Sequence, residues 1–149
     1  MFFGWKEFLI YIMSVTIKHL NPDELFKSPA FSQVITVEGN GRTIYIGGQN
    51  AVDRENRLVG KNDLHAQCTQ VMKNILEALH SSGASWKDLI KLTIYLRQGE
   101  DATQAFEAAR PFMTPGVPPP IVTVLYVAGL GNPDYLLEID GIAVIRVDE

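Results

Sequence analysis

The side chain with the clearest chemical potential in this sequence is Glu138, a carboxylate in an otherwise apolar run. Its neighbours Leu136, Leu137 and Ile139 are aliphatic, which is typical of a strand that packs into a core. A carboxylate held there could accept a proton from water as a general base. The same pattern also fits a structural carboxylate on an edge strand. Asp140, two residues further on, would share the face of Glu138.

A second group of candidates ends the strand-like run at residues 42–48. Gln49 follows Gly47 and Gly48, and paired glycines let a backbone approach a ligand closely. Gln49 would add an amide at the same point. An ordinary strand end explains these three residues equally well.

Metal and thiol chemistry find little support in the sequence. Cys68 is the only cysteine, which excludes an internal disulfide framework and any site with several thiolate ligands. Cys68 also falls on the apolar face of a predicted helix, so we expect an inert core thiol. His19, His65 and His80 have no ligand spacing with one another. The cysteine and histidine pattern therefore gives no support for a metal site.

The composition indicates a globular protein that does not bind nucleic acid. The chain has 149 residues, of which 46% are hydrophobic and 20% charged, and its net charge is −4. Proteins that bind nucleic acid usually carry a basic face, because affinity comes largely from neutralised phosphates. Runs of Lys or Arg are absent here.

Residues 1–12 differ from the rest, because they are rich in aromatic and aliphatic side chains. This stretch is shorter than the roughly 20 apolar residues that span a bilayer. Lys6 and Glu7 interrupt it, and it lacks the features of a secretory signal. We expect a non-essential extension or a segment that packs on a neighbouring subunit, followed by a single domain at 13–149. The cytoplasm is the expected location.

Hydrophobic periodicity predicts the first half of the fold. Strand-like runs at 32–38 and 42–48 flank Gly39-Asn40-Gly41, which predicts a β-hairpin. A helix follows, capped at Asn62 or Asp63 and ending near Gly83. Its apolar face is formed by Leu64, Cys68, Val71, Met72, Ile75 and Leu79.

The second half contains three predicted strands and one helix. The strand at 88–97 places Ile90, Leu92, Ile94 and Leu96 on one face. A helix begins near 101 and ends or kinks at Pro111, with Ala102, Ala105, Phe106 and Ala109 on one face. The last two strands are predicted at 121–128 and 135–147, the second with a break near Gly141.

The order β-β-α-β-α-β-β predicts a sheet with both helices on one face. The strand at 121–128 nevertheless has apolar side chains on both faces. An uncovered apolar sheet face is costly in water, so we expect another chain to cover it.

Six segments, in order, resemble the reactive-intermediate deaminase (RidA or YjgF-like) family, also called the endoribonuclease L-PSP family. AFSQ resembles its opening PYSQ element, NGRTIYIGGQ its hairpin ending in SGQ, and LEIDGIA its last strand. The resemblance covers roughly residues 28–147. The segments that carry it are 30–33, 40–49, 67–85, 88–96, 120–130 and 137–143.

The resemblance implies a fold like that of bacterial chorismate mutase. This fold is a two-layer α/β (α+β) sandwich in which a mixed sheet carries two helices on one face. It also implies a homotrimer with a barrel-like core and clefts between subunits for a small-molecule ligand. Family members with the full motif hydrolyse reactive enamines and imines to 2-oxo acids and ammonia, without metal or cofactor.

The resemblance assigns the catalytic role to Glu138. The substrate-binding positions that it implies are Phe31, Gly47, Gly48, Gln49, Phe106, Val122 and Thr123. Four of them depart from the family pattern. Val122 stands where the carboxylate-binding arginine is expected, Phe31 replaces a tyrosine, Gly47 replaces a serine, and Phe106 stands where an asparagine often lies.

The departures leave two functions open. One is a RidA-like hydrolase with an altered substrate range, and the other is a non-catalytic trimeric module that binds a small ligand or a partner. The acidic charge and the lack of a histidine pair argue against a ribonuclease. Substitutes for the missing groups could come from Arg42, Lys91, Arg97, Arg146, Tyr45 and Tyr126.

Overall fold

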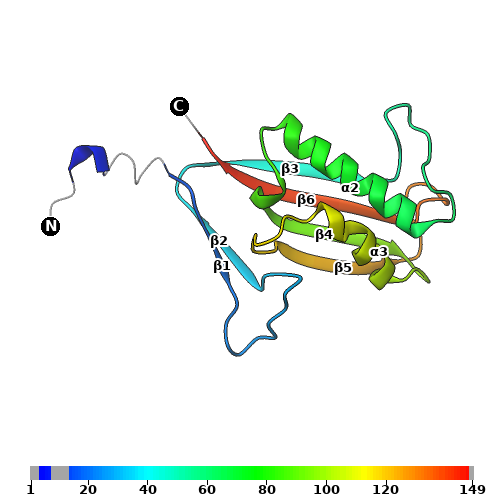
Figure 1. The fold of residues 1–149 in the computed structure, drawn as a ribbon, viewed down its shortest axis with the longest axis horizontal. Helices are drawn as coiled ribbons and strands as arrows, with labels where there is room; N and C mark the ends of the chain where they lie inside the picture. The colour runs from blue at the N-terminus through cyan, green and yellow to red at the C-terminus, as the bar shows by residue number, and fades with distance from the viewer. Residues whose placement is uncertain (1–3, 8–13, 148–149) are drawn as a thin grey trace.

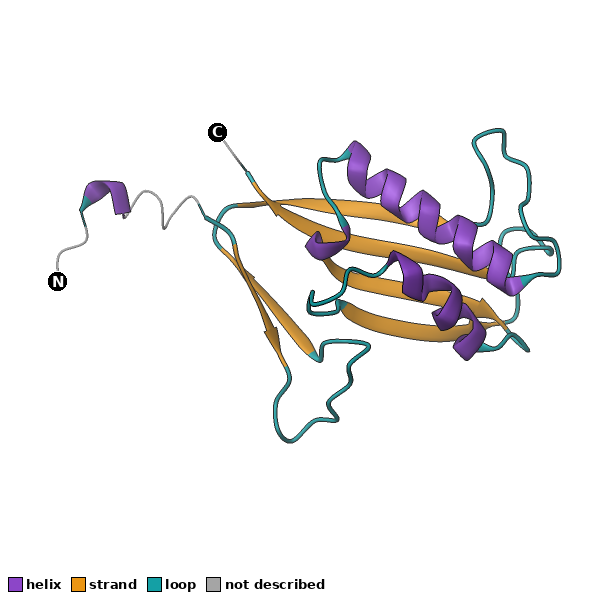
Figure 2. Cartoon of the chain, viewed as in Figure 1, coloured by secondary structure: helices purple, strands orange, loops and turns teal. Residues whose placement is uncertain are grey.

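The computed structural model describes residues 4–7 and 14–147, so most of the predicted extension at 1–12 lies outside the described residues. A four-stranded sheet is formed by β3 (Gly41–Gln49), β4 (Leu89–Arg97), β5 (Ile121–Val127) and β6 (Leu137–Arg146). Helices α2 (Leu64–Ser81) and α3 (Ala102–Ala109) cover one face of this sheet (Figures 1 and 2). The predicted α+β arrangement is confirmed.

The sheet is mixed, with the strand order β3-β6-β4-β5. β6 pairs antiparallel with both β3 and β4, whereas β4 and β5 run parallel. Parallel neighbours need a crossover connection, and α3 provides it here. The last of the four strands therefore lies between two earlier ones.

The predicted hairpin between residues 32–38 and 42–48 is wrong. β2 (Val34–Glu38) pairs instead with β1 (Thr16–Leu20), a strand that the sequence did not predict, and β3 pairs with β6. The β1–β2 ribbon extends away from the main sheet (Figure 1). Pairing with β6 allows Ile44 and Ile46 of β3 to be buried in the core, which explains why β3 takes that partner.

Both helices begin and end at the predicted signals. The Asp63 carboxylate accepts from the backbone N–H of Ala66 at the start of α2, and Gly83, with φ +75°, follows its end. All six predicted apolar residues of this helix are buried. Pro111 lies in a short 3₁₀ turn directly after α3.

Two details of the predicted strands are wrong. In β4, Leu92 and Leu96 are buried as expected, but a register shift between Leu89 and Lys91 places Leu89 in the core instead of Ile90. β6 runs without a break through Gly141. A Cβ atom at position 141 would lie 3.1 Å from Cδ2 of Leu92, so the glycine allows close packing of β4 against β6.

β5 has one neighbouring strand, β4, among the described residues. Val124 and Leu125 point to opposite faces of the sheet, and they are 45% and 46% exposed. This edge is the uncovered apolar surface that the sequence predicts. No helix among the described residues is long and apolar enough to cross a membrane.

Candidate functional site

The sheet face opposite the helices carries a polar cluster on its two central strands. Leu137 and Ile139 of β6 are buried beneath the helices, so Glu138 and Asp140 project from the other face. The register places Tyr95 of β4 beside Glu138 and Thr93 beside Asp140. We call Glu138, Asp140, Tyr95 and Thr93 the open-face cluster.

The Glu138 carboxylate is half-buried and held in place from the helix layer. Asn50 Nδ2 donates to Glu138 Oε2 at 3.1 Å. The loop that carries Asn50 is itself fixed, because Asn74 of α2 donates to the carbonyl oxygens of Asn50 and Val52, both at 3.0 Å. Two amides therefore connect α2 to the candidate general base. The sequence analysis did not single out Asn50, which lies directly after the predicted Gly47-Gly48-Gln49 group.

Gly48 provides the space that this carboxylate occupies. A Cβ atom at position 48 would lie 2.0 Å from Glu138 Oε1, which is not compatible with any real contact. A register shift between Ile46 and Gln49 produces this close approach, and Gln49 Nε2 donates across it to the Gly47 carbonyl at 3.0 Å. Of the three predicted residues, Gly48 therefore lies beside Glu138, and Gln49 bonds the neighbouring Gly47.

Asp140 has a different partner. Tyr95 donates its hydroxyl to Asp140 Oδ2 at 3.1 Å. This hydrogen bond and the negative charge of Asp140 raise the pKa of Tyr95, so the phenol stays protonated at neutral pH. The sequence analysis missed Tyr95 because its position beside two carboxylates depends on strand register. Thr123 pairs with Thr93 at the β5 edge of the same face.

The other predicted site residues lie on the helix side of the sheet. Phe31, Phe106 and Val122 line a cavity of about 340 Å³ between the helices and the sheet. We call it the α3 cavity; its walls include Leu92, Ile94, Ala105, Phe106, Met113 and Val122. Within one chain, the sheet separates these residues from Glu138. A site that uses both groups would need two copies of the chain.

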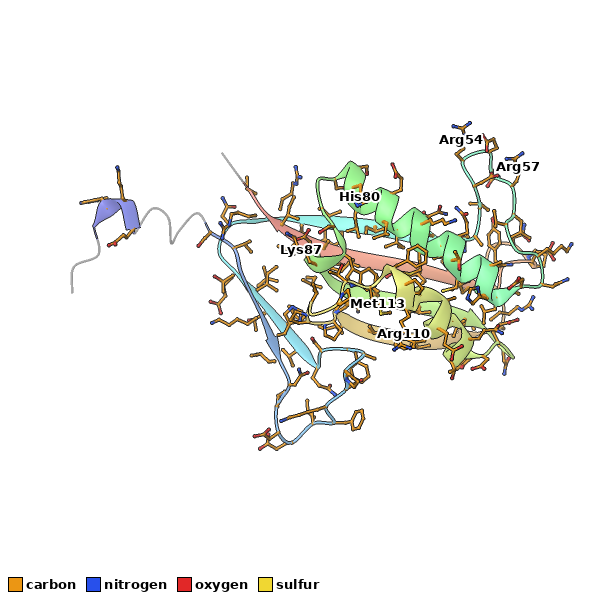
Figure 3. All side chains as sticks on the ribbon, viewed as in Figure 1. Arg54, Arg57, His80, Lys87, Arg110 and Met113 are labelled. Atoms are coloured by element: carbon orange, nitrogen blue, oxygen red, sulfur yellow. The ribbon has the colours of Figure 1, made fainter. Side chains whose placement is uncertain are left out.

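The candidate substitute cations are mostly engaged elsewhere. Arg97 binds Glu100 at 2.7 Å, and Arg42 donates to the Ser82 carbonyl at 2.6 Å. Arg42 and Arg146 line a separate hollow together with Lys87. Figure 3 shows that Lys87 and the pair Arg54 and Arg57 lie at opposite ends of α2. Lys91 is half-buried, shares the open face with Thr93, and makes no ion pair within the described part of the chain.

The remaining histidines and the cysteine lie outside the open-face cluster. His19 Nδ1 lies 2.9 Å from the Ser32 hydroxyl, and His65 and His80 are exposed on α2. Cys68 is buried and donates to the Ala105 carbonyl at 3.2 Å. Within residues 4–7 and 14–147, no group of His, Cys, Asp or Glu side chains could hold a metal ion.

Comparison with known proteins gives consistent matches. The family model described as Endoribonuclease L-PSP matches residues 23–145. A RutC family protein of Pyrococcus abyssi is 32% identical over 113 residues, which cover 76% of this chain and 84% of that protein.

Solved structures match over a similar span. A Rid family protein of unknown function, YyfB from Yersinia pestis, superposes with a TM-score of 0.77 at 29% identity, covering 87% of this chain and 98% of that one. RidA from an Antarctic Psychrobacter superposes with a TM-score of 0.63 at 26% identity, covering 78% and 94%.

Proposed function

Because the chain belongs to the endoribonuclease L-PSP family, we propose that it hydrolyses reactive enamine or imine intermediates to a carbonyl product and ammonia. The observation that carries this proposal is the Glu138 carboxylate, which Asn50 orients beside the space left by Gly48. Glu138 and Gly48 lie on the sheet face that the helices leave open, where a substrate can reach them.

The reaction requires one residue that moves protons. Glu138 accepts a proton from water as the water oxygen bonds to the imine carbon, and the C=N electron pair moves to nitrogen. Glu138 returns this proton to nitrogen, which gives a carbinolamine. Glu138 then accepts the hydroxyl proton of the carbinolamine and donates it to nitrogen, so the C–N bond breaks and ammonia leaves as the carbonyl forms. The balance is one imine and one water to one carbonyl compound and one ammonia, so no oxidant or cofactor takes part.

We propose that the reaction takes place in clefts between subunits of a homotrimer. The open-face cluster adjoins the exposed β5 edge within one chain, since Thr93 pairs with Thr123 and Tyr95 pairs with Leu125, and both are left uncovered by the helices. Packing the β5 edge of one copy against the open face of another would enclose Glu138 and cover the apolar edge. The same contact between two copies would therefore both form the cleft around Glu138 and remove the apolar edge from water.

The substrate range differs from that of relatives that carry an arginine at the position of Val122. A charge-assisted contact between Arg and a carboxylate contributes roughly 1.5–3 kcal/mol. Its absence should weaken binding of 2-imino acids about tenfold or more, since 1.4 kcal/mol corresponds to tenfold. We therefore propose uncharged imines as the preferred substrates.

The apolar surroundings of Val122 favour a second candidate function, a non-catalytic trimeric module that binds a small ligand or a partner. The lining of the α3 cavity contains no charged side chain. The two functions differ in whether Glu138 is needed for turnover.

Glu138→Gln distinguishes them. We expect the variant to keep its fold and assembly and to lose about 10²–10⁴-fold in turnover of imines generated by an amino-acid or amine oxidase, because an amide cannot accept the proton of water. Asp140→Asn is the matched control, since Asp140 shares the same face but bonds Tyr95 instead of Asn50. Equal turnover in Glu138→Gln and wild type would eliminate Glu138 as the base. No turnover in the wild type would favour the binding module.

A further inference from the structure

The hollow lined by Arg42, Lys87 and Arg146 collects positive charge in an acidic protein. Its three cations come from three separate elements, β3, the 3₁₀ turn η1 (Trp86–Asp88) and β6. One acidic side chain, Asp88, also lines it, so the side chains sum to +2, whereas the whole chain carries −4. We call it the basic hollow. A hollow lined mainly by charges of one sign concentrates ions of the opposite sign.

The three cations of the basic hollow are not neutralised by neighbouring acids. None of them makes an ion pair with any other residue that the structure describes. Asp88 is turned toward Ser85, because its Oδ2 accepts from the backbone N–H and the hydroxyl of that residue at 2.8 and 3.1 Å. An anion in the hollow would therefore supply the negative charge that the cations lack.

Arg42 is held in one orientation at the end of α2. Its Nη2 donates to the Ser82 carbonyl at 2.6 Å, directly before Gly83, where the chain turns away from the helix with φ +75°. A guanidinium has five N–H donors, so one bond to a carbonyl leaves the others for a ligand. Because this planar group is already oriented, it loses little freedom when it binds a phosphate or a carboxylate.

The size and the walls of the basic hollow fit a small organic phosphate. Its volume of about 540 Å³ lies within the roughly 300–1,000 Å³ that is usual for small-molecule pockets, and it exceeds what a simple anion fills. Ile145 and Val147 give it an apolar wall beside the cations. A phosphate monoester carries about −1.5 to −2 at neutral pH on one group, which matches the +2 of the hollow.

The basic hollow lies apart from the proposed hydrolytic centre. Arg146 and Glu138 are eight residues apart on β6, which corresponds to about 27 Å at about 3.4 Å per residue. Arg42 lies two residues from Ile44, which is buried beneath the helices, so Arg42 is on the helix side of β3. The proposed subunit contact uses the open face and β5, the opposite edge strand, and leaves the hollow accessible.

We propose that the basic hollow binds the phosphate monoester of a small organic molecule. Arg42, Lys87 and Arg146 surround the phosphate, and Ile145 and Val147 pack against the organic part. This binding does not depend on the proposed hydrolysis, and it is measured without turnover.

Titration of the full-length, assembled protein with phenyl phosphate tests this proposal. We expect saturable binding by calorimetry and a higher melting temperature, because a ligand that binds only the folded protein stabilises it. Phenol lacks the charge and inorganic phosphate lacks the ring, so each should bind about tenfold or more weakly. No binding of phenyl phosphate, or equal binding of phenyl phosphate and inorganic phosphate, would overturn the proposal.

Substitutions that remove single charges locate the site. Lys87→Gln and Arg146→Gln should each lower the affinity for phenyl phosphate about tenfold or more, and both should fold normally because the two side chains are exposed. Arg54→Gln is the matched control, since Arg54 is an exposed cation at the other end of α2 (Figure 3). Wild-type affinity in both folded variants would place the ligand elsewhere and overturn the proposal.

The acidic residues that follow Val147 in the sequence, Asp148 and Glu149, provide a competing occupant. The double variant Asp148→Asn/Glu149→Gln should bind phenyl phosphate at least as tightly as the wild type, because it removes only negative charge near the hollow. Binding that appears only in this variant would mean that the chain's own carboxylates fill the hollow, and it would overturn the proposal.

Discussion

At the scale of single residues, positions 48 and 138 depend on each other. We expect Gly48→Ala to displace the Glu138 carboxylate, because the added Cβ would lie 2.0 Å from Oε1, and to lower imine turnover at least tenfold. Gly47→Ala is the neighbouring control, since a Cβ there would meet nothing within 4 Å. Steady-state kinetics on both variants would measure the difference. Equal losses would mean that the glycines serve strand geometry and not the carboxylate.

Gln67 is a buried polar residue whose role is structural. Its amide donates to the carbonyls of Gly60 and Asp134, and Leu136 N–H donates to its Oε1. Gln67→Leu would leave the buried Leu136 N–H and the part-buried Asp134 carbonyl without this partner, each costing about 1–3 kcal/mol, whereas the Gly60 carbonyl keeps the N–H of Asp63. We expect a loss of about 3 kcal/mol or more in the free energy of unfolding, measured by urea denaturation. Gln104→Leu, on the exposed face of α3, should change it little.

Sequence reasoning at this scale identified residue types better than positions. Gly48 does lie beside Glu138, and the family resemblance had implied that both belong to one site. Val122 and Phe31 lie across the sheet from them. Alternation along a strand predicts two faces, but only tertiary packing decides which face the helices cover.

At the scale of elements, Ser32 joins the β1–β2 ribbon to the segment before β5 by two hydrogen bonds. Its backbone N–H donates to the Pro120 carbonyl at 3.0 Å, and its hydroxyl donates to the Pro119 carbonyl at 2.6 Å. We expect Ser32→Ala to lower stability by about 1 kcal/mol and to speed proteolysis within residues 21–33. Ser81→Ala, which removes a hydroxyl from the exposed end of α2, is the control. Unchanged cleavage rates would mean that other contacts hold the ribbon.

The elements themselves were predictable where their signals are local. Periodicity and caps identify α2 and α3, because a helix is set by residues three and four apart. β1 was missed, since TIKHL alternates weakly and gains its strand character from β2. The partner of β3 could not be predicted from the turn before it, because β6 lies about a hundred residues away.

At the scale of the whole molecule, the exposed β5 edge predicts assembly. We expect a homotrimer by light scattering at micromolar concentration, and we expect Leu125→Lys to dissociate it, because a charge would replace an apolar contact. Glu77→Lys, on the exposed face of α2, should leave the mass unchanged. A wild-type monomer would refute both the assembly and the shared cleft.

The central position of β6 governs when this chain can fold during its own synthesis. β3 is complete at residue 49, yet its partner ends at residue 146, which is 97 residues later. At about 5–20 residues per second, a ribosome needs roughly 5–20 s to cover that distance. During that time α2, β4 and α3 are synthesised, but their apolar faces have no complete sheet to pack against. The nascent chain should therefore bind holding chaperones until β6 emerges, and ribosome-bound chains stalled before residue 137 should remain protease-sensitive.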